Sequence, residues 1–424
     1  MFKKHPKGLA VLFFTEMWER FGFYTLMAVF VLYMEKEFDW NDEQKGDLYG
    51  IFLGLVYFLP LLGGWLGDRV IGRMNSIRLG GSLMAIGFAA LAASSSTRLE
   101  FFYIGLFLIA LGTGIFKVNI SVSIGELYET SDPLKDAGYN IYYMGVNLGA
   151  TIAPLVATAI SVAFGSYQLS FAAASIGMLL SLLIFGLGKK QISALAQKQG
   201  SSFENNRQTE NEKNQEDSQR IITCLILFTI VIFFWIAFYQ NGFALTLFAK
   251  RSTIVSEVLR PETYQFFNPF FILLLTPLLV SFFASLRRKG KEPSSATKIF
   301  WGMFISGFSM VTMVFASMAG GNLDEKIMSP LWLVGAYFII SVSEIMVSPM
   351  GQSFVSKVAP RRIQGVMMGL WFCATAIGSY GSGLLGRFYS SFFHHHYYMI
   401  IAGLLFFSSI LVIVFRKQLN RFSA

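Results

Sequence analysis

The stretch LAVLFFTEMWERFGFYTLMAVFVLYM, residues 9–34, is long and apolar enough to cross a bilayer, yet its middle carries Glu16, Glu19 and Arg20. A transmembrane helix needs about 20 mostly apolar residues. A charge at the centre of such a helix costs roughly 2.5–3.5 kcal/mol on insertion scales. These three side chains are therefore expected to face one another or a watery cavity, which is typical of a transporter core rather than a membrane anchor.

Two more ionisable side chains, Lys117 and Glu344, lie deep in other apolar segments. Only 14% of the residues are charged and 54% are hydrophobic, whereas soluble domains carry about 25% charged residues. We therefore expect an all-α membrane protein. The sequence predicts twelve spans, at residues 9–34, 46–66, 76–96, 101–124, 139–164, 169–188, 220–248, 264–286, 297–319, 329–355, 362–386 and 395–415.

The net charge of +9 follows membrane topology and does not indicate nucleic-acid binding. With the N-terminus in the cytoplasm, 24 of the 34 Lys and Arg residues fall in cytoplasmic segments and eight fall outside. Cytoplasmic loops of membrane proteins carry such an excess of Lys and Arg. Both termini are therefore predicted to be cytoplasmic, with the lipid bilayer as the surrounding partner.

A polar stretch from Gln191 to Arg220 divides the spans six and six. It reads as a flexible linker because it has almost no apolar residues. The predicted domains are a six-helix bundle at residues 1–190, a cytoplasmic linker at 191–219 and a second bundle at 220–424. Two related bundles suggest a substrate site between them near the membrane midplane.

The loop after the second span reads GWLGDRVIGR, residues 64–73. Its glycines allow tight turning, and Asp68 with Arg69 and Arg73 can clamp neighbouring helix ends. The spacing resembles the loop motif of the major facilitator superfamily, although ordinary cytoplasmic charge with turn glycines is the alternative. The resemblance implies the fold of that superfamily.

Glu16, Glu19, Arg20 and Tyr24 fall on one helical stripe of the first span, because residues three and four apart share a face. An acid–base cluster there is partly self-neutralised and can still hold a carboxylate that takes up and releases a proton. The alternative is a buried ion network that only fixes helix packing.

Five segments in chain order resemble signatures of the proton-coupled oligopeptide transporters, a peptide-carrying branch of the major facilitator superfamily. The first is Glu-x-x-Glu-Arg-Phe-x-x-Tyr at residues 16–24. The others are GTGIFKVN at 112–119, YYMGVNLG at 142–149, QFFNP at 265–269 and SEIMVSP at 343–349.

The resemblance implies a site for a di- or tripeptide, which is a zwitterion with amide groups and variable side chains. Lys117 would hold the carboxylate and Glu344 the amine, because buried charges need opposite partners. Asn147 and Asn268 can donate to and accept from the peptide backbone, with interhelical hydrogen bonding as the alternative. Aromatic side chains would line the side-chain pockets, or simply pack: Tyr24, Tyr57 and Trp235.

Carboxylates are expected to carry the proton, because no histidine lies at the centre of a predicted span. Glu16 and Glu19 are the first candidates and Glu344 the next, within a network completed by Arg20 and Lys117. We hypothesise that Lys117 partners Glu16 in one state and substrate in another. Residues 394–396 are three histidines at the outer end of the last span, and a solvated cluster is expected there rather than a metal site.

The chain departs from the family pattern at two positions. Many members have a second arginine three residues past the tyrosine of the first span, where this chain has Met27, and an acid where it has Tyr239. In the family these groups are implicated in an ion pair that helps close the outer gate. Losing only one would leave an uncompensated buried charge. We predict that Tyr239 packs or hydrogen-bonds near Met27 and replaces this latch.

The sequence thus predicts a secondary active transporter that imports di- and tripeptides with protons by alternating access. The alternatives are a same-fold proton-coupled carrier of another small anion or drug-like solute, and a non-transporting sensor. No metal-ligand spacing, P-loop or nucleophile elbow is present, so an enzyme is not expected, and no cofactor is expected beyond protons. We expect a monomer in a bacterial inner membrane.

Overall fold

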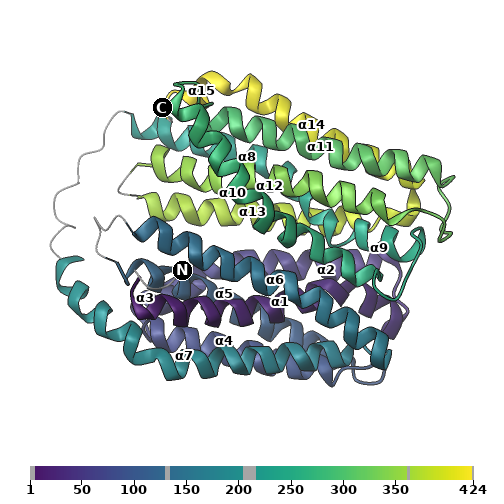
Figure 1. The fold of residues 1–424 in the computed structure, drawn as a ribbon, viewed down its shortest axis with the longest axis horizontal. Coiled ribbons are helices and arrows are strands. Elements are labelled where there is room, and N and C mark those ends of the chain that lie inside the picture. Colours follow the sequence, from purple (N-terminus) through teal and green to yellow (C-terminus); the bar gives the residue numbers. More distant parts are fainter. Residues whose placement is uncertain (1–4, 129–133, 204–215, 361–362, 423–424) are drawn as a thin grey trace. The chain divides into compact units, whose positions relative to one another are not determined.

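The computed structural model describes residues 5–128, 134–203, 216–360 and 363–422, and these residues form α-helices linked by short turns and loops (Figure 1). The first half contains α1 (Lys7–Phe38), α2 (Asp42–Phe58), α3 (Pro60–Arg69), α4 (Arg73–Ala92), α5 (Leu99–Gly125), α6 (Lys135–Phe164) and α7 (Gln168–Phe203). The second half contains α8 (Asp217–Phe238), η3 (Tyr239–Asn241), α9 (Ala244–Arg251), η4 (Pro261–Phe266), α10 (Phe267–Arg288), α11 (Ser295–Ala319), α12 (Pro330–Val358), α13 (Gln364–Gly386), η6 (Tyr389–Ser391), α14 (His394–Val414) and α15 (Arg416–Asn420).

Within the described residues, 10 helical segments are long and apolar enough to cross a membrane. Helices α2 and α3 together make one of them, Asp42–Arg69. The two predicted spans outside this set lie in α1, which carries three charges in its middle, and in α13, whose apolar residues are diluted by glycine and serine. The all-α membrane fold is confirmed, and the full count of twelve spans stays a prediction.

The chain forms two compact units, and their borders differ from the predicted domain limits. The first unit comprises Met1–Tyr33 and Leu55–Glu212, and the second comprises Met34–Gly54 and Lys213–Ala424. The outer end of α1 and most of α2 therefore pack with the second half of the chain. Hydropathy cannot show this, because it marks where a helix lies along the sequence and not what it contacts.

The predicted linker at 191–219 is shorter in the structure, since α7 continues to Phe203 and α8 begins at Asp217. Residues 189–199 read KKQISALAQKQ, and Lys, Gln, Ala and Leu are good helix formers that let a helix continue beyond the membrane. Residues 204–215, at the centre of the polar stretch, lie outside the described part of the chain.

The two halves share a packing pattern that supports the predicted repeat. In the first unit, α4 packs against α5 and α7, and in the second, α11 packs against α12 and α14. In each half the third helix thus contacts the fourth and the sixth. Glycines allow close crossing: a Cβ built at Gly80 of α4 would lie 2.7 Å from the carbonyl oxygen of Gly112 in α5.

Helix α6 crosses α1 closely enough to complete the charged cluster of the first unit. A Cβ built at Gly149 would lie 2.1 Å from the carbonyl oxygen of Met17. Only glycine fits such an approach of two backbones. This contact sets Tyr142, two turns earlier on α6, beside the acidic face of α1.

Candidate functional site

Glu16, Glu19 and Arg20 meet on α1, as their spacing predicts. Arg20 Nε lies 3.2 Å from Glu16 Oε1, and Arg20 Nη2 donates to Glu19 Oε1 at 2.6 Å. The Arg20 Nε group also donates to Glu19 Oε2. Relative exposures are 1% for Glu16, 0% for Glu19 and 4% for Arg20. One guanidinium is therefore shared by two buried carboxylates.

Glu16 is the less completely paired of the two acids. The hydroxyl of Tyr142 donates to its carboxyl group, but Glu16 Oε2 has no hydrogen-bond partner among the residues described. A buried carboxylate oxygen without a donor is costly. A proton on that oxygen relieves the cost, so Glu16 is the better placed of the pair to carry one. Sequence reasoning gave Tyr142 no role, although it opens the fifth-span motif.

Lys117 on α5 adds the fourth charge of this cluster. Its ammonium lies 5.1 Å from the ring centre of Tyr57 and interacts electrostatically with Arg20, Glu16 and Glu19. Within the described ranges it makes no ion pair with a carboxylate. The structure thus gathers the predicted proton-coupling residues of the first unit and leaves the Lys117 cation available to an anion.

Glu344 on α12 is the corresponding charge of the second unit. Asn268 on α10 donates to Glu344 Oε2 at 2.9 Å and to Ser341 Oγ at 3.1 Å. Among the described residues no cation lies within ion-pair distance of Glu344, so only neutral donors offset its charge. Asn268 thus makes interhelical hydrogen bonds, the alternative considered for it from the sequence, and through them orients Glu344.

The remaining candidate residues are placed as follows. Trp235 stacks on Tyr239, with ring centres 5.6 Å apart at 27°, and its buried Nε1 has no partner within the described residues. Asn147 Nδ2 donates to the Tyr143 carbonyl of its own helix at 3.0 Å, and Tyr24 packs edge-on against Phe23. The predicted contact between Tyr239 and Met27 joins different units and stays a prediction.

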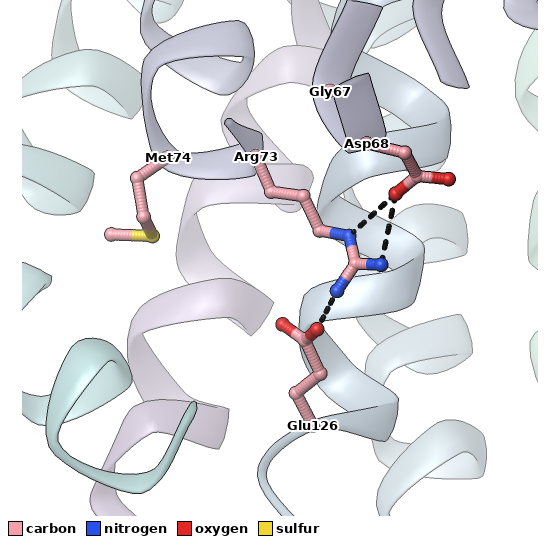
Figure 2. A pocket seen from close by; sticks show the side chains of 5 residues that line it. All are labelled: Gly67, Asp68, Arg73, Met74 and Glu126. Carbon is pink, nitrogen blue, oxygen red and sulfur yellow. Dashed lines mark hydrogen bonds and ion pairs between the residues drawn. The ribbon is translucent and has the colours of Figure 1, made fainter. Parts of the chain in front are cut away.

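Figure 2 shows the loop motif as a clamp centred on Arg73. Arg73 Nη2 lies 2.9 Å from Asp68 Oδ1, and its Nη1 pairs with Glu126 just beyond α5. Gly72 has φ +78°, a conformation that favours glycine and lets the chain turn into α4. Arg69 is exposed and takes part in no ion pair within the described chain, so its predicted role in the clamp stays a prediction. Glu126 was missed, although it follows the fourth predicted span directly.

A second clamp lies in the corresponding loop of the second half, after α10. Glu292 accepts from Arg287 at 2.5 Å and from Lys298 at 2.7 Å. Hydrogen bonds from Arg287 and then Lys298 lower the pKa of Glu292 to about 2. Gly290, with φ +65°, makes the turn there as Gly72 does in the first half. No sequence motif pointed to this loop.

Of the three histidines at the start of α14, His396 is exposed and His395 is half-buried, but His394 differs from the expected solvated cluster. His394 is 6% exposed and stacks on Tyr389 at 5.2 Å, and its Nε2 lies 3.3 Å from Asp324. His394 is the first residue of α14, and its ring is covered by Tyr389 of η6. Hydropathy does not reveal such a contact between separate segments. In the described part of the chain, no three His, Cys, Asp or Glu side chains are grouped to hold a metal.

The comparisons with known proteins agree with this architecture. The model of the POT family matches residues 74–208 and 190–400. The chain is a member of the POT family. It is 30% identical to dipeptide and tripeptide permease A of Escherichia coli over 90% of this chain and 85% of that protein. It is equally similar, at 30%, to the peptide transporter YePEPT of Yersinia enterocolitica over 90% and 88% of the two chains.

Solved structures of POT proteins show the same fold. A crystal structure of a peptide transporter POT in complex with sulfate has a TM-score of 0.89 and 28% identity, covering 100% of this chain and 97% of that one. The resemblance seen in the five sequence segments is confirmed, as is the major facilitator type of fold. This POT protein is a multi-pass transporter of the bacterial inner membrane and not an enzyme.

Proposed function

We propose that this POT protein imports di- and tripeptides together with protons by alternating access. The observation that carries the proposal is a pair of opposite charges without ionic partners, one in each unit. Among the described residues, Lys117 has no carboxylate in an ion pair and Glu344 has only neutral donors. Charges inside a membrane protein are costly unless paired, so each of them favours a ligand group of opposite sign.

A peptide carries both missing groups. Its carboxylate suits the Lys117 ammonium, and its amine suits the Glu344 carboxylate. Relatives support this substrate class, since they include a dipeptide and tripeptide permease and a peptide transporter. The peptide's own side chains would contact the aromatic side chains of Tyr24, Tyr57 and Trp235. Asn147 would lie near the peptide backbone.

Charge balance in the first unit connects peptide and proton. Glu16, Glu19, Arg20 and Lys117 sum to zero when all are ionised. A peptide carboxylate bound at Lys117 adds one negative charge, and buried unbalanced charge is unfavourable. A proton on Glu16, whose Oε2 has no donor among the described residues, restores neutrality. Peptide and proton would therefore bind together. The proposal includes no cofactor other than protons, and the transporting unit is a monomer.

The test is uptake of a labelled dipeptide into proteoliposomes, with and without an inward proton gradient and with unlabelled peptides as competitors. Saturable uptake that accumulates only with the gradient, and that peptides inhibit, is the expected result. Accumulation without the gradient would contradict proton coupling.

A different solute is the second candidate, because Met27 stands where many family members have an arginine. The site then has one cation fewer for a carboxylate. Folded protein that shows no peptide uptake, while another small anion drives counterflow, would favour this alternative.

A further inference from the structure

The predicted outer ends of α1 and α2 carry a buried lysine between two acids. Lys45 is 0% exposed, and its ammonium lies 2.5 Å from Glu35 Oε2 and 2.8 Å from Asp42 Oδ1. All three residues belong to the segment Met34–Gly54, which packs within the second unit. Lys45 therefore holds the two carboxylates in fixed positions on this short segment.

Two basic residues of helix α9 form ion pairs with these carboxylates. Arg251 donates to both oxygens of Asp42, through Nη2 to Oδ1 at 2.8 Å and through Nη1 to Oδ2 at 3.0 Å. Lys250 Nζ lies 2.8 Å from Glu35 Oε1. Two-pronged Arg–carboxylate contacts are both strong and geometrically specific.

Arg387, directly after α13, makes a second set of ion pairs with α2. It pairs with Glu43, and its Nη1 lies 3.3 Å from Asp47 Oδ1. With the pairs above, four acids meet four bases, so the whole set is neutral. We call it the outer clamp: Glu35, Asp42, Glu43, Asp47, Lys45, Lys250, Arg251 and Arg387.

Below the outer clamp, α2 touches α13 backbone to backbone. A Cβ built at Gly383 would lie 2.3 Å from the Gly46 carbonyl oxygen and 2.3 Å from Gly50 Cα. The Tyr49 hydroxyl donates to the Tyr239 carbonyl at 2.9 Å. Tyr239, which occupies the position of the family's latch acid, is thus held through its backbone carbonyl by α2.

We propose that the outer clamp and the glycine contact beneath it form the outer gate of this transporter, in place of the latch whose two positions are Met27 and Tyr239. The gate closes when α9 and Arg387 dock on the carboxylates that Lys45 holds ready. The inference rests on the proposed transport function and on the predicted topology, which puts these loops outside.

Such a gate can open repeatedly because most of its ion pairs are only partly buried. Exposed ion pairs contribute about 0–1 kcal/mol each, so hydration largely replaces them when the segments part. The best buried contacts, those of Lys45, stay within the α1–α2 segment and need not break. Gly46, Gly50 and Gly383 carry no side chains that would interlock the two backbones.

Reversible cross-linking tests whether the segments must separate. In a Cys224→Ser, Cys373→Ser background, a Glu43→Cys, Arg387→Cys pair replaces one ion pair of the clamp with a disulfide. We expect oxidation to lower dipeptide uptake at least about tenfold and a reductant to restore it. The matched control, Asp324→Cys with His394→Cys, replaces a contact made within the second half, and its oxidation should leave uptake unchanged. Full uptake by the oxidised clamp pair would overturn the proposal.

A measurement that needs no substrate separates failure of the gate from failure of the proposed function. Spin labels at Asp39 and Phe393, both exposed, report the separation of the α1–α2 loop from the start of α14. We expect Arg251→Gln to raise the ratio of the longer-distance to the shorter-distance population at least about tenfold, because it removes the two-pronged, charge-assisted contact of α9 with Asp42. Lys326→Met, at an exposed outer lysine, is the control. Distances that Arg251→Gln leaves unchanged would sink the gate, whatever the protein transports.

Discussion

At the scale of single residues, the proposed coupling of proton and substrate rests on Glu16 Oε2, which has no hydrogen-bond partner among the described residues. Replacing Glu16 by Gln removes the proton site but keeps a side chain of similar size beside Arg20 and Tyr142. We expect uptake to lose its response to a pH gradient, while exchange of labelled for unlabelled peptide continues. Paired uptake and counterflow assays in proteoliposomes measure both.

Glu325→Gln is the matched control for this experiment, because Glu325 is exposed in the loop before α12. It should keep the full gradient response. Retention of pH-driven uptake by Glu16→Gln would show that the proton binds elsewhere in the chain.

Glu344, offset only by neutral donors in the described structure, is the residue expected to recognise the peptide amine. A hydrogen bond to a charged group contributes about 1.5–3 kcal/mol, which corresponds to roughly tenfold to a hundredfold in affinity. Glu344→Gln should weaken binding of a free dipeptide by that factor. It should weaken an N-acetylated dipeptide much less, and isothermal titration of both ligands checks the difference. Equal losses for the two would assign Glu344 a role other than amine recognition.

At the scale of helices, the crossing of α6 over α1 depends on Gly149. In Gly149→Leu the new side chain meets the Met17 backbone, and overpacking typically costs about 1–3 kcal/mol. We expect a lower melting temperature in detergent and weakened proton coupling, because Tyr142 moves from Glu16. Gly403→Leu on α14, where a Cβ has nothing within 4 Å, should leave both properties intact.

The loop joining α10 to α11 gives a prediction about pH. Glu292 has its pKa lowered to about 2 by Arg287 and Lys298, so its stabilising contribution is present above the ordinary carboxyl pKa and is lost as pH falls towards 2. Between pH 5 and pH 7 the group stays ionised. Glu292→Gln should therefore leave the shape of the uptake–pH profile in this range unchanged, and a shifted profile would link this clamp to proton coupling.

At the scale of the whole molecule, the distribution of Lys and Arg predicts that both termini lie in the cytoplasm. Green fluorescent protein fused to the C-terminus should fluoresce, because it folds on that side of the membrane. Alkaline phosphatase fused after Lys326, in a loop predicted to lie outside, should be active. The opposite pair of results would invert the topology and place the outer clamp on the cytoplasmic side.

The sequence by itself determined the membrane class, the family and the charged stripe on the first helix. These depend on local properties: apolar length, residue spacing along one helix, and short motifs such as that at residues 16–24. The resemblance also pointed to Lys117 and Glu344 before any contact was known. Hydropathy could not show that α7 extends to Phe203, because a helix that leaves the membrane is held by propensity and not by apolar residues.

Only the tertiary structure decided which charges meet. Arg73 pairs with Glu126, Asn268 with Glu344, and Arg251 with Asp42, although 53, 76 and 209 residues separate these partners in the chain. The sequence lists each of these polar side chains without its partner. Pairing depends on how helices cross, and those crossings are set by backbone contacts at glycines such as Gly149 and Gly383, whose neighbours lie far away in sequence. Local patterns fix the helices, and contacts between distant segments fix the chemistry.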